Sequence, residues 1–161
     1  MLEKFDTEKH LPILKKWVVD EDLLFQFSAH GFTFPLTERQ FVIYEAAHPD
    51  RRFYMAYNSE KQPYAFGEII PQDQVSVRIG RLLVGGKENR GKGLGGKLIG
   101  ELLKQVRKKH LVTRVDLFVL ESNLGAQKCY LKAGFKHMDS SPLFLSFKGE
   151  KLPVLKMSLE L

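Results

Sequence analysis

The sequence predicts one α/β domain built on a mixed, largely antiparallel sheet that is flanked by helices. Short segments rich in β-branched and aromatic residues follow one another in the middle of the chain. In the second half, strand-like segments alternate with amphipathic helical ones. A chain of 161 residues without repeats or an interdomain linker suits a single domain, residues 1–161, with a sizeable core.

Two helices are expected before the first strand. The first covers residues 8–22, and the second runs from a capping Thr37 to about Ala47. The apolar residues of the first helix share one face: Leu11, Leu14, Trp17 and Val18. An aromatic stretch, residues 25–35, lies between the helices, and residues 28–31 within it are expected to form an exposed loop. Its phenylalanines can pack the helices onto the sheet or line a ligand pocket.

The remaining elements follow from apolar alternation, helical spacing and polar turns. They are expected in this order: strands 52–57, 64–70 and 75–84, helix 94–109, strand 114–120, helix 124–132, and a closing hairpin of strands 144–147 and 154–159. The order β-β-β-α-β-α-β after a helical segment gives a mixed sheet with helices on its faces.

The most informative segment joins strand 75–84 to helix 94–109 and reads Arg90-Gly91-Lys92-Gly93-Leu94-Gly95-Gly96. Its glycines leave backbone N–H groups free at a helix N-terminus, and its basic side chains add positive charge, so it can hold a phosphate or pyrophosphate. It is not a P-loop, because no Gly-Lys-Ser/Thr sequence is present. It matches a dinucleotide fingerprint only weakly, because no acidic residue ends a second strand about 20 residues later.

The block from about Ile79 to Phe135 resembles the GNAT superfamily of acyl-CoA-dependent N-acetyltransferases. The features that carry this resemblance are Arg90, Gly93 and Gly95 in the loop, Asn123 at the next βα turn, and Tyr130 four residues before Gly134-Phe135. The resemblance implies the GNAT-like fold and acetyl-CoA as the co-substrate. It also implies direct acetyl transfer to a primary amine, without a metal or a covalent intermediate. The stretch 80–84 is most similar to the branch that acetylates the N-termini of ribosomal proteins and assorted small amines.

The resemblance also assigns the cofactor half of the site. Residues 90–96 would bind the pyrophosphate of coenzyme A, and Asn123 would position the pantetheine arm. Backbone groups of Leu82, Leu83 and Val84 would hold the pantetheine and donate to the thioester. A break in this strand would admit the arm, and Gly85-Gly86 can either open the backbone there or form a plain turn.

Tyr130 is the candidate general acid. A phenol with a pKa near ~10 can protonate a departing thiolate if it reaches the sulfur. Its alternative role is a core tyrosine on an amphipathic helix. Asn123 can also cap helix 124–132, which is compatible with a contact to pantetheine. Cys129 is interpreted as a small buried thiol and not as an acyl-carrying nucleophile, because no histidine partner is evident.

The general base is less well defined, because strand 75–84 contains no carboxylate. Glu68 on the neighbouring strand is the first candidate, and an outward-facing polar residue is its alternative role. Glu45 and His30 are weaker candidates, and a water chain without a dedicated base also stays open. The missing carboxylate leaves one alternative function, a catalytically silent acyl-CoA-binding or sensing module.

Composition limits the partners. The formal charge of +6 is spread along the glycine loop and its helix, without a basic tail, so a nucleic-acid partner is not expected. No apolar run could span a membrane, and the charged first residues favour a cytoplasmic protein. A single cysteine excludes an internal disulfide and a Cys/His zinc site. The apolar final strand could pair across a homodimer. The acceptor stays open among a peptide N-terminus, lysine, a polyamine and an antibiotic amine.

Overall fold

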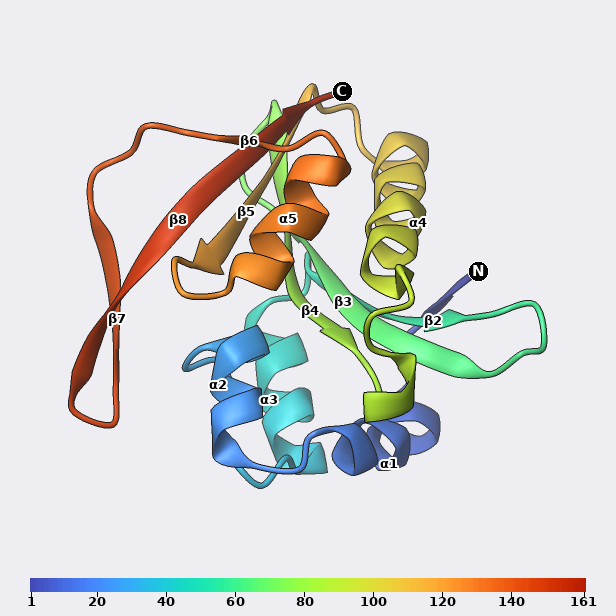
Figure 1. The fold of residues 1–161 in the computed structure, drawn as a ribbon. Helices are drawn as coiled ribbons and strands as arrows, with labels where there is room; N and C mark the ends of the chain where they lie inside the picture. The colour runs from blue at the N-terminus through green and yellow to red at the C-terminus, as the bar shows by residue number, and fades with distance from the viewer.

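A computed structural model describes residues 1–161, which form an eight-stranded sheet with five α-helices (Figure 1). The strands are β1 (Leu2–Lys4), β2 (Arg52–Tyr57), β3 (Pro63–Pro71), β4 (Ser76–Val84), β5 (Arg114–Leu120), β6 (Lys136–His137), β7 (Leu143–Phe147) and β8 (Glu150–Glu160). The helices are α1 (Thr7–Trp17), α2 (Glu21–Ser28), α3 (Glu38–Ala47), α4 (Leu94–Lys109) and α5 (Leu124–Lys132). The predicted mixed, largely antiparallel sheet is confirmed.

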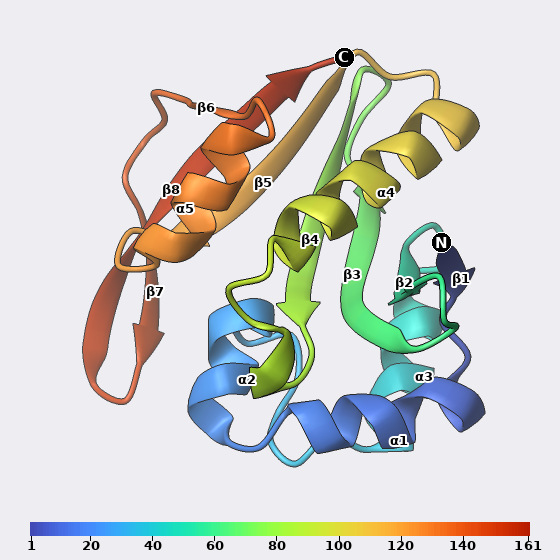
Figure 2. The same ribbon diagram turned by 45° about the vertical axis from the view of Figure 1, so that its right-hand side comes forward.

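The sheet is split between β4 and β5. Its strand order is β1-β2-β3-β4-β5-β8-β6, with β7 on β8, and every pairing is antiparallel except β4 with β5. The parallel pairing spans only Ser76↔Arg114 to Arg78↔Asp116. Beyond Arg78 the two strands diverge like the arms of a V (Figure 2). The fold therefore leaves this edge of β4 without a strand partner after Arg78.

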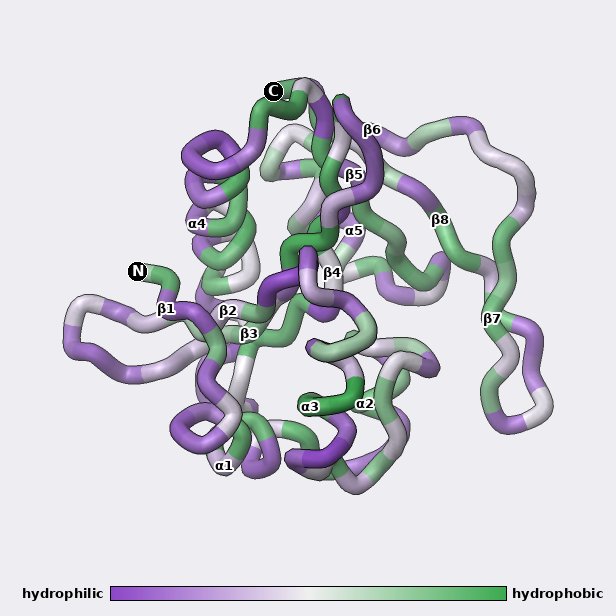
Figure 3. The backbone as a smooth tube through the Cα atoms, turned by 180° about the vertical axis from the view of Figure 1, so that it is seen from behind, coloured by the Kyte–Doolittle hydropathy of each residue, from purple (hydrophilic) through white to green (hydrophobic).

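Each face of the sheet has its own apolar core. Helix α4 packs on one face through Leu98, Leu102 and Val106, and α5 lies beside it. Seen from behind, α4 turns its hydrophobic side to the sheet and its hydrophilic side outward (Figure 3). Helices α1, α2 and α3 cover the other face around a second core that includes Phe41 and Phe66. None of the five helices has both the length and the apolar composition needed to cross a bilayer.

The N-terminal helix prediction is wrong in its extent. Residues 8–22 form two elements, because α1 ends at Trp17 with Val18 as its C-cap and α2 starts after Asp20, whose carboxylate accepts a hydrogen bond from the Leu23 N–H at 2.8 Å. The expected exposed loop at 28–31 is also only partly right, since Ser28 is buried in the last turn of α2. Strands β1 and β6 were not predicted. Both are too short to show an apolar alternation.

The last strand is longer than predicted and is paired on both sides. Residues 154–160 of β8 pair with β5 on one side. On its other side β8 pairs with β7 and then with β6. This arrangement removes the argument that the final strand offers a free edge for a homodimer.

Candidate active site

A bulge in β4 lies where the strands separate. Glu68 pairs with Gly80 and Phe66 pairs with Leu83, so β4 has one more residue than β3 in this interval. The additional residue adopts an unusual backbone, since Arg81 has φ +49°. Because a bulge reverses the alternation of side chains, Leu82 packs on the α4 side and Leu83 on the opposite side.

The bulge corrects the expected position of the strand break. Gly85 continues the pairing with β3, because its N–H donates to the carbonyl of Tyr64 at 2.8 Å. Gly86, with φ +78°, starts a short 3-10 turn, Lys87–Asn89. Gly85-Gly86 is therefore a turn, and the divergence of β4 from β5 begins earlier, after Arg78.

A cleft with a volume of about 850 Å³ occupies the split between the two strands. Its lining residues come from α2, β4, β5, the glycine loop, α4, α5 and the β7–β8 hairpin. Almost all predicted site residues line it: Leu82, Leu83, Val84, Arg90, Gly91, Gly93, Leu94, Gly95, Gly96, Asn123 and Tyr130. Lys92 is exposed and lies outside the lining. The split thus brings together segments that are separated by almost 100 residues, from α2 to α5.

The glycine loop ends at an uncapped helix N-terminus. Gly93 is the N-cap of α4 with φ +74° and makes no side-chain cap, so the first N–H groups of the helix keep free hydrogen-bonding capacity. Gly91 also has a positive φ of +75°. A Cβ built on Gly91, Gly93 or Gly96 would meet no atom within 4 Å. The glycines therefore leave open space beside these donors, which a bulky anion can occupy.

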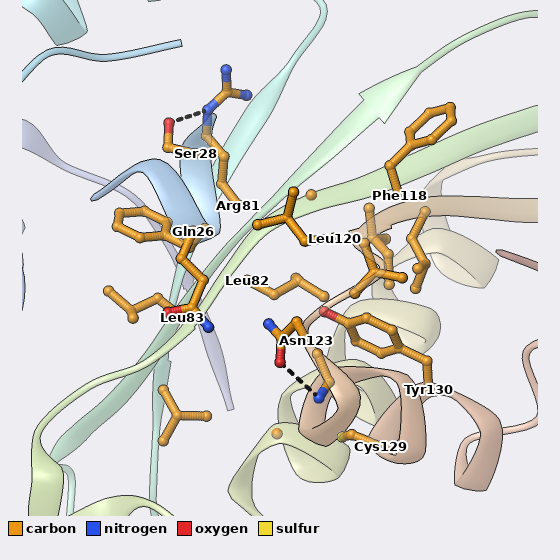
Figure 4. A pocket seen from close by; sticks show the side chains of 18 of the residues that line it. Gln26, Ser28, Arg81, Leu82, Leu83, Phe118, Leu120, Asn123, Cys129 and Tyr130 are labelled. Atoms are coloured by element: carbon orange, nitrogen blue, oxygen red, sulfur yellow. Dashed lines mark hydrogen bonds between the residues drawn. The ribbon is translucent and has the colours of Figure 1, made fainter. Parts of the chain in front are cut away.

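Asn123 and Tyr130 project from α5 into the cleft (Figure 4). The Asn123 side chain caps α5 by accepting from the Ala126 N–H at 3.1 Å, as predicted. Tyr130 presents its hydroxyl toward β4, and burial raises the pKa of this phenol far above its ordinary value. It is therefore protonated at neutral pH. Burial also raises the pKa of the neighbouring Cys129 thiol, which makes a thiolate nucleophile at that position less accessible.

The structure places Glu68 outside the cleft lining. Its side chain is completely buried on the face covered by α3. One carboxylate oxygen accepts from Tyr44 at 2.6 Å, and the other accepts from the Arg81 guanidinium. Both expectations for its setting, in the cleft or outward-facing, are therefore wrong. Of the weaker candidates, Glu45 is exposed and His30 contacts the Ser146 carbonyl at 2.7 Å.

Arg81 connects this buried carboxylate to the wall of the cleft. Its guanidinium also donates to the Tyr44 hydroxyl at 2.9 Å and to Ser28 Oγ at 3.1 Å (Figure 4). A Cβ on Gly31 would lie 2.1 Å from this guanidinium, so the chain passes directly over it. Sequence reasoning missed Arg81 and Tyr44. The available signal was an arginine in the otherwise apolar run of residues 79–84.

Comparisons with known proteins agree with this geometry. The acetyltransferase (GNAT) family model matches residues 18–135. A UPF0039 protein of Schizosaccharomyces pombe is 33% identical over 107 residues, which cover 66% of this chain and 66% of that protein. The spermidine N-acetyltransferase of Vibrio cholerae, solved with CoA and spermine, superposes with a TM-score of 0.81 at 15% identity, covering 99% of this chain and 94% of that one. A ribosomal-protein-alanine N-acetyltransferase of Brucella melitensis gives 0.74 at 17% identity, covering 100% and 99%.

Proposed function

Since the chain belongs to the acetyltransferase (GNAT) family and transfers the acetyl group of acetyl-CoA to an amine, we propose that transfer takes place in the cleft between β4 and β5. One observation carries this proposal. The uncapped N-terminus of α4 and the protonated Tyr130 hydroxyl open into the same cleft, along the unpaired edge of β4. An anion site and a proton donor are thus joined by backbone that is free to bind an extended ligand.

The glycine loop would bind the pyrophosphate of the co-substrate. The first N–H groups of α4 supply donors, and the helix dipole favours a negative charge there. The exposed Arg90 and Lys92 add positive charge at the same end of the helix. The open space at Gly91, Gly93 and Gly96 allows the phosphate oxygens to approach the backbone closely.

The pantetheine arm would lie along residues 82–84. This part of β4 is paired with β3 on one side, but β5 has diverged on the other. Its unpaired N–H and C=O groups can therefore bind the amide groups of the arm as a strand would. Asn123 lies across the cleft, where its side-chain amide can donate to the same arm while its oxygen caps α5.

In this proposal the amine nitrogen forms a bond to the thioester carbonyl carbon, and the carbon–sulfur bond breaks. A backbone N–H near Leu83 or Val84 would donate to the carbonyl oxygen as it gains charge. Tyr130 would give its phenolic proton to the departing thiolate. No Asp or Glu lines the cleft, so the proton of the amine would leave to water. Glu68 then acts as a positioning residue through Arg81 and not as the base.

Two further proposals concern the cellular location and the oligomeric state of the protein. We propose a cytoplasmic location, with which the single free thiol of the half-buried Cys129 is compatible. We propose that any homodimer contact lies away from residues 154–158 of β8, which lie between β5 on one side and β7 or β6 on the other.

The proposal is tested by measuring CoA release from acetyl-CoA with a panel of amines, together with acetyl-CoA binding by calorimetry. Amine-dependent release and competition by free CoA are expected. Binding without release under every amine would favour an acyl-CoA-binding module instead. A chain that does not bind acetyl-CoA at all would overturn the assignment of the glycine loop.

A further inference from the structure

The cleft continues past the co-substrate region to the face covered by α2. This acceptor end is lined by side chains from four elements: Gln26, Ser28, Arg78, Phe118, Leu120 and Leu145. The β7–β8 hairpin closes one side of it, since Phe147 stacks on Phe25 with a centroid distance of 4.1 Å and Lys148 contacts Asp22 at 2.8 Å. The acceptor end is therefore a walled site with a defined chemistry.

The charge of this site is positive. The cleft is lined by 33 residues, and its only charged members are the arginines Arg78, Arg81 and Arg90. Arg90 lies at the glycine loop, so the remaining charges are Arg78 at the acceptor end and Arg81, which donates to Ser28 beside it. Arg81 already has a counter-charge, because it is paired with the buried Glu68. Arg78, by contrast, forms no ion pair, and Glu68 acts on it only through space.

The guanidinium of Arg78 has no ion-pair partner within the protein. It lies over the Phe118 ring, 5.4 Å from the centroid, and no protein carboxylate lies within ion-pair distance of it. Arg51 is nearby but donates to the Tyr44 hydroxyl at 2.7 Å. Burial, together with the like charges of Arg51 and Arg81, lowers the pKa of Arg78, although Glu68 and Tyr44 oppose this shift. The group stays charged at neutral pH, and a half-buried charge without a partner gains much from an incoming anion.

We propose that Arg78 determines acceptor specificity by binding an oxyanionic group, so that the preferred acceptor is a small primary amine that carries a carboxylate or phosphonate. The inference rests on the proposed function and adds the substrate class. A guanidinium offers parallel N–H donors whose spacing matches two oxygens of such a group. A polyamine, by contrast, would bring cationic nitrogens next to Arg78 with no carboxylate in the cleft to receive them.

Matched acceptors test this inference. CoA release is measured with β-alanine against propylamine, γ-aminobutyrate against butylamine, and aminoethylphosphonate, with spermidine as the polycation. Calorimetry on the CoA-saturated protein measures binding of the same amines. We expect kcat/KM at least about 10-fold higher for the carboxylate-bearing member of each pair, in line with a charge-assisted hydrogen bond. Comparison of aminoethylphosphonate with β-alanine distinguishes recognition of a phosphonate from recognition of a carboxylate.

Variants of Arg78 test whether this residue is the source of the acceptor preference. Arg78→Gln is expected to reduce the ratio of kcat/KM between each carboxylate-bearing amine and its alkylamine counterpart to near one, and Arg78→Lys to keep part of it. Arg107→Gln, at an exposed position on α4, removes the same charge and should keep the ratio. Equal or better use of the unsubstituted alkylamines or spermidine by the wild type, in turnover and binding, overturns the inference and leaves acetyl transfer intact. Absence of acetyl-CoA binding instead overturns the proposed function.

Discussion

Arg81 and Glu68 face each other across the bulge between β3 and β4, where the guanidinium donates to the buried carboxylate. Tyr44 donates to the same carboxylate, and the desolvated phenol has a pKa above its ordinary value because of burial and its bond to Glu68. The ion pair between Arg81 and Glu68 therefore fixes Arg81, the residue of β4 with the unusual φ of +49°. This links a buried ion pair on the α3 side to the unpaired strand edge on the cleft side.

Replacement of Glu68 is expected to lower both stability and co-substrate binding. Glu68→Gln leaves the mostly buried Arg81 guanidinium without its counter-charge, which costs about 3 kcal/mol in the free energy of unfolding. In the fraction that stays folded, the KM for acetyl-CoA should rise, because the edge formed by residues 82–84 depends on the bulge. Urea unfolding and steady-state kinetics well below the melting temperature measure the two effects.

Glu45→Gln is the matched control, because Glu45 is exposed on α3. It should change the free energy of unfolding by less than about 0.5 kcal/mol. The double variant Glu68→Gln/Arg81→Met should recover part of the lost stability, since it removes the unpaired charge. A Glu68→Gln protein as stable as the wild type would contradict the role of this pair.

Two glycines of α4 separate phosphate binding from helix stability. Gly96→Ala is expected to weaken acetyl-CoA binding by about 10-fold, because the methyl group fills space beside the helix N-terminus. Gly100→Ala lies one turn later, also meets no atom within 4 Å, and does not line the cleft. It should raise stability by about 0.5 kcal/mol with unchanged affinity. Calorimetry measures the affinity of both variants for acetyl-CoA. Equal affinities of the two variants would contradict the phosphate site.

Stability should fall in acid because of Asp116, which holds the closed end of the split. Burial alone would raise its pKa, but hydrogen bonds from Ser158, Gln72 and Arg114 outweigh burial, so the pKa lies below its ordinary value. A depressed folded-state pKa stabilises the fold above the unfolded value of about 4, and this contribution is lost as the pH falls through the folded pKa.

The difference between the wild type and Asp116→Asn isolates this group. The variant should be less stable at about pH 7, and the gap in the urea midpoint should narrow at about pH 3. Other carboxylates titrate in both proteins, so their contributions cancel in the difference between the two urea midpoints. A gap that is the same at both pH values would show that the ionised form of Asp116 does not stabilise the fold.

The sequence predicted those elements whose pattern is local. Helix α4 has the predicted bounds, because its apolar positions recur regularly between a glycine start and a basic last turn. The break at Val18 was missed, since the apolar residues of α1 and α2 continue one helical pattern across it. The setting of Glu68 was missed for a different reason. It depends on the register of β4 against β3, and one additional residue there decides which face Arg81 reaches.

Tyr130→Phe tests the proposed acid most directly, because the change removes only a hydroxyl. That hydroxyl has no hydrogen-bond partner within the protein, so stability and acetyl-CoA affinity should not change. The kcat should fall about 100-fold, the lower range for loss of a general acid.

Burial keeps the phenol protonated, so wild-type kcat should not decline up to about pH 9 through loss of this proton. An acetyl donor with a better thiolate leaving group, such as S-phenyl thioacetate in place of acetyl-CoA, should reduce the difference between the two proteins. An unchanged kcat would assign Tyr130 to the cleft wall alone and leave protonation of the thiolate to water.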